Sequence, residues 1–98
     1  MSEAASRPAR DLGGVAARIA ALTDGVTDPV ALMATMACEL KGVPGYDWVG
    51  FYRVTGPETL TIGPYQGPHG CLTIPFARGV CGAAARSRET VIVPDVEA

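Results

Sequence analysis

YDWVGFYRV, residues 46–54, is the point where apolar side chains stop recurring at helical spacing and begin to alternate. Its aromatic and β-branched residues are typical of a strand. In such a strand Trp48, Gly50 and Tyr52 share one face. The turn-forming sequence TGPE comes next, and residues 59–63 then supply a second strand. We therefore predict a β-hairpin here.

Two amphipathic helices are predicted before this hairpin. Apolar residues recur at helical spacing from Leu12 to Leu22, and Gly25 is placed to end that helix. The second helix is expected to have proline at its first position, Pro29, and to end at Gly42. Most of residues 12–42 is therefore expected to be helical.

The sequence after the hairpin predicts shorter elements. Residues 64–70 contain two prolines and two glycines, which indicates a loop. A third strand is predicted over Cys71–Phe76, a short helix over Gly79–Arg88 and a fourth strand over Thr90–Val93. The predicted fold is α+β: a mainly antiparallel sheet with the two N-terminal helices on one face and a ligand pocket on the other.

Composition limits the classes of function. The 98 residues have room for one domain, and 48% hydrophobic with 18% charged residues is a globular composition. We expect residues 1–10 to be a disordered tail. The net charge of −2, with scattered charges, leaves no basic stripe, so neither nucleic acid nor an anionic membrane is an expected partner. Without a signal-peptide core or a membrane-spanning run, the chain is predicted to be cytoplasmic.

The aromatic residues around Gly50 suggest a binding slot. A glycine between Trp48 and Tyr52 on one strand face leaves a gap about one side chain wide, walled by flat apolar rings with polar tips. Such a slot suits a small, partly apolar ligand, and sulfur packs well against aromatic rings. The alternative is an ordinary core strand in which Gly50 marks a bulge or a close backbone approach.

Two cysteines are candidates for chemistry. Cys81 falls in the first turn of the predicted helix, where unpaired amides, the helix dipole and nearby Arg78 favour a thiolate. The thiolate is the reactive form in attack on sulfur. The alternative is that Cys81 is a small apolar residue like the alanines that follow it. Cys71 opens a strand beside a glycine-rich loop, from which a thiol can move toward a partner.

The remaining cysteine and the single histidine carry no predicted role. Three cysteines are an odd number, which argues against a secreted disulfide framework. His69 stands near Cys71 and Cys81, but a zinc site needs four ligands in recognisable spacing, and no Cys-x-x-Cys pair is present. We therefore predict no metal site. Cys38 is expected to be a packing residue of the second helix.

Together these stretches resemble one family. The segments YDWVGFY (residues 46–52), IGPYQG (62–67) and CLTIPFARGVCG (71–82) occur in the order and spacing of the free methionine-(R)-sulfoxide reductases, which are GAF-fold enzymes. The resemblance extends from about residue 11 to the last residue. Its most specific part is the pair Cys71 and Cys81 around the Ile-Pro-Phe core, because a GAF domain that only senses ligands has no need of those thiols.

The resemblance implies a reaction. A cysteine thiolate attacks the sulfur of free L-methionine-(R)-S-oxide, methionine leaves, and a sulfenic acid remains on the enzyme. A second cysteine then forms a disulfide, which thioredoxin reduces, so no bound cofactor is expected. Cys71 and Cys81 match two of the family's three active-site cysteines, and Trp48 and Tyr52 match the residues that wall its substrate pocket. Which cysteine resolves the disulfide stays open, with Cys71 favoured for the mobility of its loop.

The resemblance also implies that residues 11–98 are the N-terminal part of a single GAF domain. The family's third cysteine, the acidic residues that hold the substrate's amino group, and the last strands and closing helix all match positions beyond Ala98. Residues 1–98 alone are therefore expected to be inactive. Two alternatives remain: a GAF module that senses a small ligand without catalysis, and a non-functional gene fragment.

Overall fold

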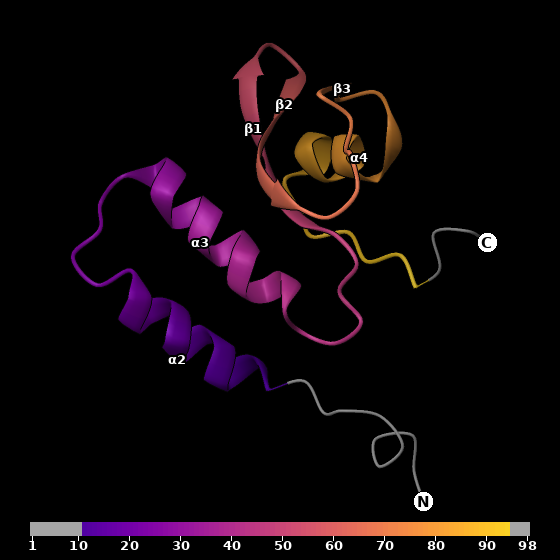
Figure 1. Ribbon diagram of the computed structural model, residues 1–98. Coiled ribbons are helices and arrows are strands. Elements are labelled where there is room, and N and C mark those ends of the chain that lie inside the picture. Colours follow the sequence, from indigo (N-terminus) through magenta and orange to yellow (C-terminus); the bar gives the residue numbers. More distant parts are fainter. Residues whose placement is uncertain (1–10, 95–98) are drawn as a thin grey trace, which may run out of the picture. The chain divides into compact units, whose positions relative to one another are not determined.

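The structure is a computed structural model that describes residues 11–94 (Figure 1). The predicted tail, residues 1–10, and residues 95–98 lie outside the described part. The described chain forms two compact units, one made of residues 11–51 and 63–70 and the other of residues 52–62 and 71–94. The first two strands of the sheet pass through both units.

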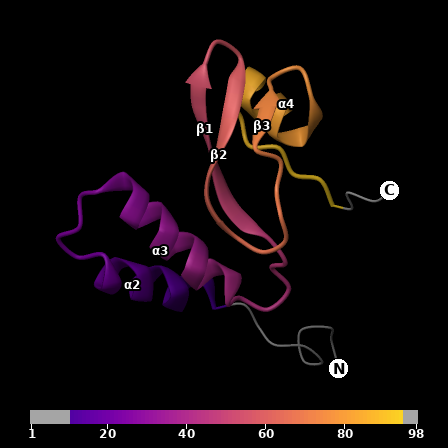
Figure 2. The same cartoon turned by 45° about the horizontal axis from the view of Figure 1, so that its top comes forward.

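The first unit contains the N-terminal helices α2 (Leu12–Leu22) and α3 (Pro29–Lys41), which lie side by side (Figures 1 and 2). The carboxylate of Asp11 caps α2 by accepting a 2.8 Å hydrogen bond from the amide of Gly14. Proline occupies the start of α3, where its missing N–H costs nothing, and Gly42 caps the end. Both predicted helices are confirmed.

Few side chains of this unit are buried. Ala37 on α3 and Val43 just after it form its buried apolar centre. Arg18 Nε donates to Glu39 Oε1 at 2.5 Å and links α2 to α3, but an ion pair with so exposed an arginine adds little stability. Within residues 11–94 no helix is both long enough and apolar enough to cross a membrane.

The sheet has the strand order β1-β2-β3, formed by β1 (Val49–Gly56), β2 (Thr59–Gln66) and β3 (Thr73–Pro75). A tight turn at Pro57 and Glu58 joins β1 to β2. Strands β2 and β3 are antiparallel, with Leu60 opposite Ile74, and Leu60 is only 5% exposed. The predicted α+β class with a mainly antiparallel sheet is confirmed.

In the second unit the helix α4 (Gly79–Ser87) packs against β3 (Figure 2). Gly82 makes this close approach possible, because a Cβ there would lie 2.6 Å from the carbonyl oxygen of Phe76. Arg86 Nη1 also donates to that carbonyl. Arg88 adopts a left-handed conformation, with φ 59°, and ends the helix. The predicted helix over residues 79–88 is confirmed to within one residue.

The strands differ from the prediction at their ends. Residues 46–48 precede β1 instead of belonging to it, and Cys71 and Leu72 precede β3. The loop predicted from residue 64 begins only at Gly67, because Pro64 lies inside β2. Strand β3 pairs only with residues 59–61 of β2, so within residues 11–94 one side of β2 has no partner strand at Pro64. Proline is tolerated at such a position because it has no N–H to donate to a neighbouring strand.

The fourth predicted strand is wrong. Residues 90–93 adopt no regular structure, and the side chain of Ile92 is 83% exposed. Their β-branched residues have the composition of a strand, but a strand also needs a neighbour to satisfy its amides and cover its apolar face. The described part of the chain offers these residues no such neighbour.

Candidate functional site

Trp48 is the centre of an aromatic cluster in the first unit. Its ring stacks on Tyr65 of β2, with the ring centroids 5.4 Å apart and an angle of 22° between the planes. Its indole Nε1 donates a 2.9 Å hydrogen bond to the carbonyl of Pro68. These contacts fasten the loop after β2 to the start of β1. Trp48 therefore has a structural role in addition to the binding role predicted for it.

The gap predicted above Gly50 is filled. A Cβ at this position would lie 2.5 Å from Trp48 Cη2 and 2.5 Å from the Cβ of Tyr65. The prediction of an open slot is wrong because the space on the Cβ side of Gly50 is occupied by the Trp48 ring itself and by Tyr65. Trp48 precedes β1, and its ring folds back over Gly50. Glycine is required here for the close approach of the two aromatic residues.

Tyr52 belongs to the second unit, where it contacts the segment that carries Cys71. Its hydroxyl donates a 2.8 Å hydrogen bond to the backbone carbonyl of Cys71. The carbonyl of the next residue, Leu72, accepts a 2.9 Å hydrogen bond from the amide of Ile62 on β2. The structure thus connects one predicted substrate-binding residue with one predicted catalytic cysteine, through a hydrogen bond to the cysteine's backbone.

Both candidate cysteines lie in the second unit, and both are free and exposed. Cys81 is the third residue of α4, in the first turn as predicted, where the amides at the helix start have no intrahelical partner. The amide of Arg78, the residue before α4, donates to the carbonyl of Pro75 at 3.1 Å, which holds the turn into the helix. An exposed thiol at a helix start is accessible to a small sulfur substrate or to another thiol.

Cys38 differs from its prediction. It was expected to be a packing residue, but it is exposed on α3 in the first unit, while its neighbour Ala37 is buried. Within residues 11–94 no three histidine, cysteine, aspartate or glutamate side chains come together in a way that could hold a metal ion. His69 also belongs to the first unit, whereas Cys71 and Cys81 belong to the second.

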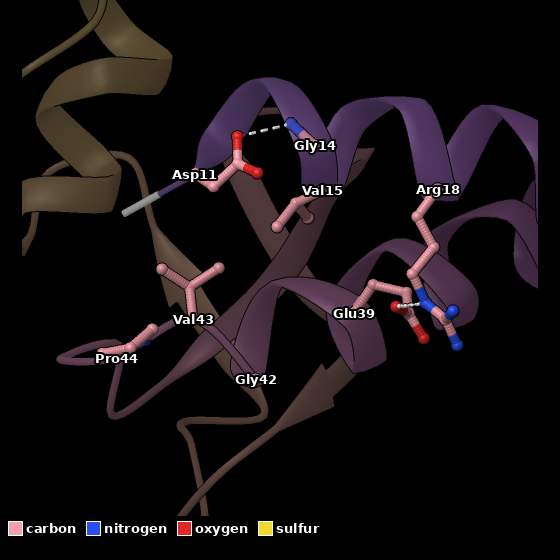
Figure 3. Close-up of a pocket in the computed structure, with 8 residues that line it drawn as sticks. All are labelled: Asp11, Gly14, Val15, Arg18, Glu39, Gly42, Val43 and Pro44. Atoms are coloured by element: carbon pink, nitrogen blue, oxygen red, sulfur yellow. Dashed lines mark hydrogen bonds and ion pairs between the residues drawn. The ribbon is translucent and has the colours of Figure 1, made fainter. Parts of the chain in front are cut away.

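The sequence did not predict a hollow of about 460 Å³ between α2 and the end of α3 (Figure 3). Its polar groups bond to one another: Asp11 caps the amide of Gly14, and Arg18 pairs with Glu39. It contains no cysteine. No pattern in the sequence indicates it, because its lining residues come from the starts and ends of two separate helices. The residues lining it are Asp11, Gly14, Val15, Arg18, Glu39, Gly42, Val43 and Pro44.

Known proteins of similar sequence include GAF domain-containing protein A of Dictyostelium discoideum, which is 41% identical over 80 residues. That match covers 82% of this chain and 51% of the relative. The free methionine-R-sulfoxide reductase of Escherichia coli is 38% identical over 77 residues, covering 78% of this chain and 46% of that enzyme. No family model matches the sequence.

A solved structure extends this similarity to the fold. The X-ray structure of free methionine-R-sulfoxide reductase from Neisseria meningitidis, in complex with its substrate, matches with a TM-score of 0.81 and 42% sequence identity. The match covers 92% of this chain and 57% of that one. The chain thus spans about half the length of the relatives it matches, and its predicted resemblance to the GAF-fold free methionine-(R)-sulfoxide reductases is confirmed.

Proposed function

We propose that this chain supplies the aromatic cluster and two thiols of an enzyme that reduces free L-methionine-(R)-S-oxide to L-methionine. The observation that carries the proposal is its similarity to a reductase solved with its substrate, at 42% identity over 92% of this chain. A second observation supports it: Cys71 and Cys81 are both exposed and lie in the same compact unit.

The proposed chemistry needs only thiols. A cysteine thiolate attacks the sulfoxide sulfur, the S–O oxygen passes to the cysteine, and a proton completes the release of methionine and formation of a sulfenic acid. A second thiol attacks that sulfenic sulfur, a disulfide forms, and the hydroxyl leaves as water. The two thiols of reduced thioredoxin then restore the enzyme's thiols and become oxidised themselves. Thioredoxin is thus the external reductant, no bound cofactor is required, and the reducing cytoplasm is the proposed compartment.

The experiment requires a protein of the relatives' full length. We define the completed chain as residues 1–98 joined to the C-terminal part of the Escherichia coli reductase, which begins where its match with this chain ends. The completed chain is expected to reduce the free R epimer and to leave the S epimer and peptide-bound sulfoxide unchanged. The physical reason is that a pocket closed around one free amino acid, as the resemblance to the reductases implies, excludes a polypeptide.

Methionine release from each substrate, with thioredoxin and its reductase supplied, measures this selectivity. Equal turnover of a sulfoxide-containing peptide would contradict the proposal. A second candidate function is ligand sensing without catalysis, favoured by the filled space above Gly50 and by a relative named only for its GAF domain. Saturable binding of a small ligand with no methionine release would support that candidate instead.

Trp48→Ala in the completed chain is expected to raise KM for methionine sulfoxide without unfolding the protein. Sulfur–aromatic attraction is worth about 0.3–1.5 kcal/mol, which corresponds to roughly a 2- to 12-fold weaker capture of substrate. Trp48→Phe is the matched control, because it keeps a ring to stack on Tyr65 and removes only the donor to Pro68. Steady-state kinetics and thermal melts decide the outcome. Aggregation of Trp48→Ala, or a collapse of its melting temperature, would show that the residue is structural alone.

A further inference from the structure

The hydrogen bond from Tyr52 to Cys71 joins strands that are not neighbours. Tyr52 lies on β1, and Cys71 lies just before β3, while β2 separates the two in the sheet. The tyrosine side chain therefore reaches across β2 to donate its hydroxyl to the carbonyl oxygen of Cys71, at 2.8 Å. Nineteen positions of sequence separate the two residues.

A second bond holds the same segment from β2. The carbonyl of Leu72 accepts a hydrogen bond from the amide of Ile62 at 2.9 Å. Two consecutive carbonyls, those of Cys71 and Leu72, are thus anchored to two different strands. Both residues are nevertheless exposed. The backbone at Cys71 is therefore held at two adjacent carbonyls although the residue lies at the surface.

The anchored backbone means that Cys71 does not rely on a mobile loop to reach a partner thiol. Sequence reasoning favoured Cys71 as the resolving thiol because a mobile loop would let it move. The structure instead anchors its backbone. A disulfide requires the two Cα atoms to lie about 4.4–6.8 Å apart, so fixing one Cα restricts where its partner must arrive.

We propose that Tyr52 is a positioning residue that fixes the backbone of Cys71 and thereby sets where its thiol is presented for disulfide formation. The role of that thiol rests on the proposed function. In this step the Cys71 thiolate attacks a sulfenic sulfur, the S–S bond forms as the S–O bond breaks, and the hydroxyl of the sulfenic acid takes one proton from solvent and leaves as water. The ring of Tyr52 can wall a substrate pocket at the same time, because only its hydroxyl is used in the anchor.

Tyr52→Phe separates the two roles, because it keeps the ring and deletes the hydroxyl. In the completed chain, labelling by a bulky maleimide, followed by peptide mass spectrometry, gives the modification rate of each cysteine in the same molecule. One neutral hydrogen bond corresponds to a factor of about 2–12 in a local equilibrium. We expect Cys71 to react faster by about that factor relative to Cys81 and Cys38, with amide exchange at Ile62 accelerated to a similar extent.

Tyr46→Phe is the matched control, since it deletes the hydroxyl of a tyrosine in the first unit, and it should leave the Cys71 rate unchanged. An unchanged ratio of Cys71 to Cys81 labelling in Tyr52→Phe overturns the proposal. An equal acceleration at all three cysteines also overturns it, because that pattern indicates general loosening. A completed chain without reductase activity would refute the proposed function and leave this labelling result fully informative about the anchor.

Discussion

Cys71→Ser in the completed chain is expected to lower thioredoxin-coupled turnover by roughly 100-fold or more, because regeneration needs a thiol that can attack the sulfenic acid. A serine hydroxyl is nearly the same size but is not a comparable nucleophile at neutral pH. The first turnover should survive if the third family cysteine is the nucleophile. A burst of about one methionine per enzyme, followed by very slow release, is therefore the expected time course.

The other two cysteines provide the comparison. Cys81→Ser is expected to lower steady-state turnover less than Cys71→Ser, because the backbone of Cys71 is the one that Tyr52 anchors and that we propose is positioned for disulfide formation. The steady-state turnover of Cys38→Ser should stay within about twofold of that of the parent protein. Cys38 lies on α3 in the other compact unit, and it is exposed, so serine is tolerated there. If Cys38→Ser is the variant that loses turnover, the assignment of Cys71 and Cys81 is wrong.

Residues 1–98 expressed alone are expected to lack both reductase activity and a cooperative melting transition. Within the described residues, the buried apolar side chains are Ala37, Val43 and Leu60. Full burial of a large apolar side chain contributes about 1.5–3 kcal/mol, whereas ordering the backbone costs about 1–2 kcal/mol for every residue. So small a buried set cannot support the roughly 5–15 kcal/mol of net stability that a folded domain has.

Exposed apolar side chains point to the same result. Leu72, Val80 and Ile92 of the second unit are all exposed, at 61%, 44% and 83% of their surfaces. Calorimetry, near-ultraviolet circular dichroism and binding of a hydrophobic dye measure the state of the isolated chain, and the completed chain is the control. A sharp melting transition in residues 1–98, together with turnover of methionine sulfoxide, would show that two cysteines suffice and that the third is dispensable.

The helices could be predicted from the sequence because their signals are local. Proline at the first position of α3 and glycine just after its end mark both boundaries within a few residues of the helix itself. The end of α4 was predictable to within one residue. The left-handed residue that caps this helix is Arg88, where glycine is the more usual residue. Each of these boundaries depends on backbone groups at most four residues away.

The strand ends could not be predicted, because a strand is completed by a partner far away in the sequence. Residues 90–93 have strand composition and no described neighbour, so they remain irregular. Pro64 indicated a loop, yet it lies in β2 at a point where the described sheet leaves one side of that strand open. In both cases the deciding quantity is the pairing of strands, which composition does not encode.

The candidate site was predictable by residue type but not by geometry. The motifs indicated the two cysteines, and their exposure in one unit agrees with a chemical role. The reach of the Tyr52 hydroxyl across β2 to the carbonyl of Cys71 joins residues nineteen positions apart and leaves no trace in the pattern of either segment. The position of the Trp48 ring over Gly50 was also hidden, because strand alternation gives the face on which a side chain lies but not whether its ring covers the glycine two positions away.

Trp48 gives this protein a built-in optical reporter. It is the only tryptophan in the sequence, so indole emission from the 98 residues comes from a single place. That place is the stack with Tyr65 and the hydrogen bond to the carbonyl of Pro68, both within the first unit. Emission that shifts toward longer wavelength on heating would report water reaching the indole as the stack opens. The aromatic cluster can therefore be followed by fluorescence alone, independently of any assay of the thiols in the second unit.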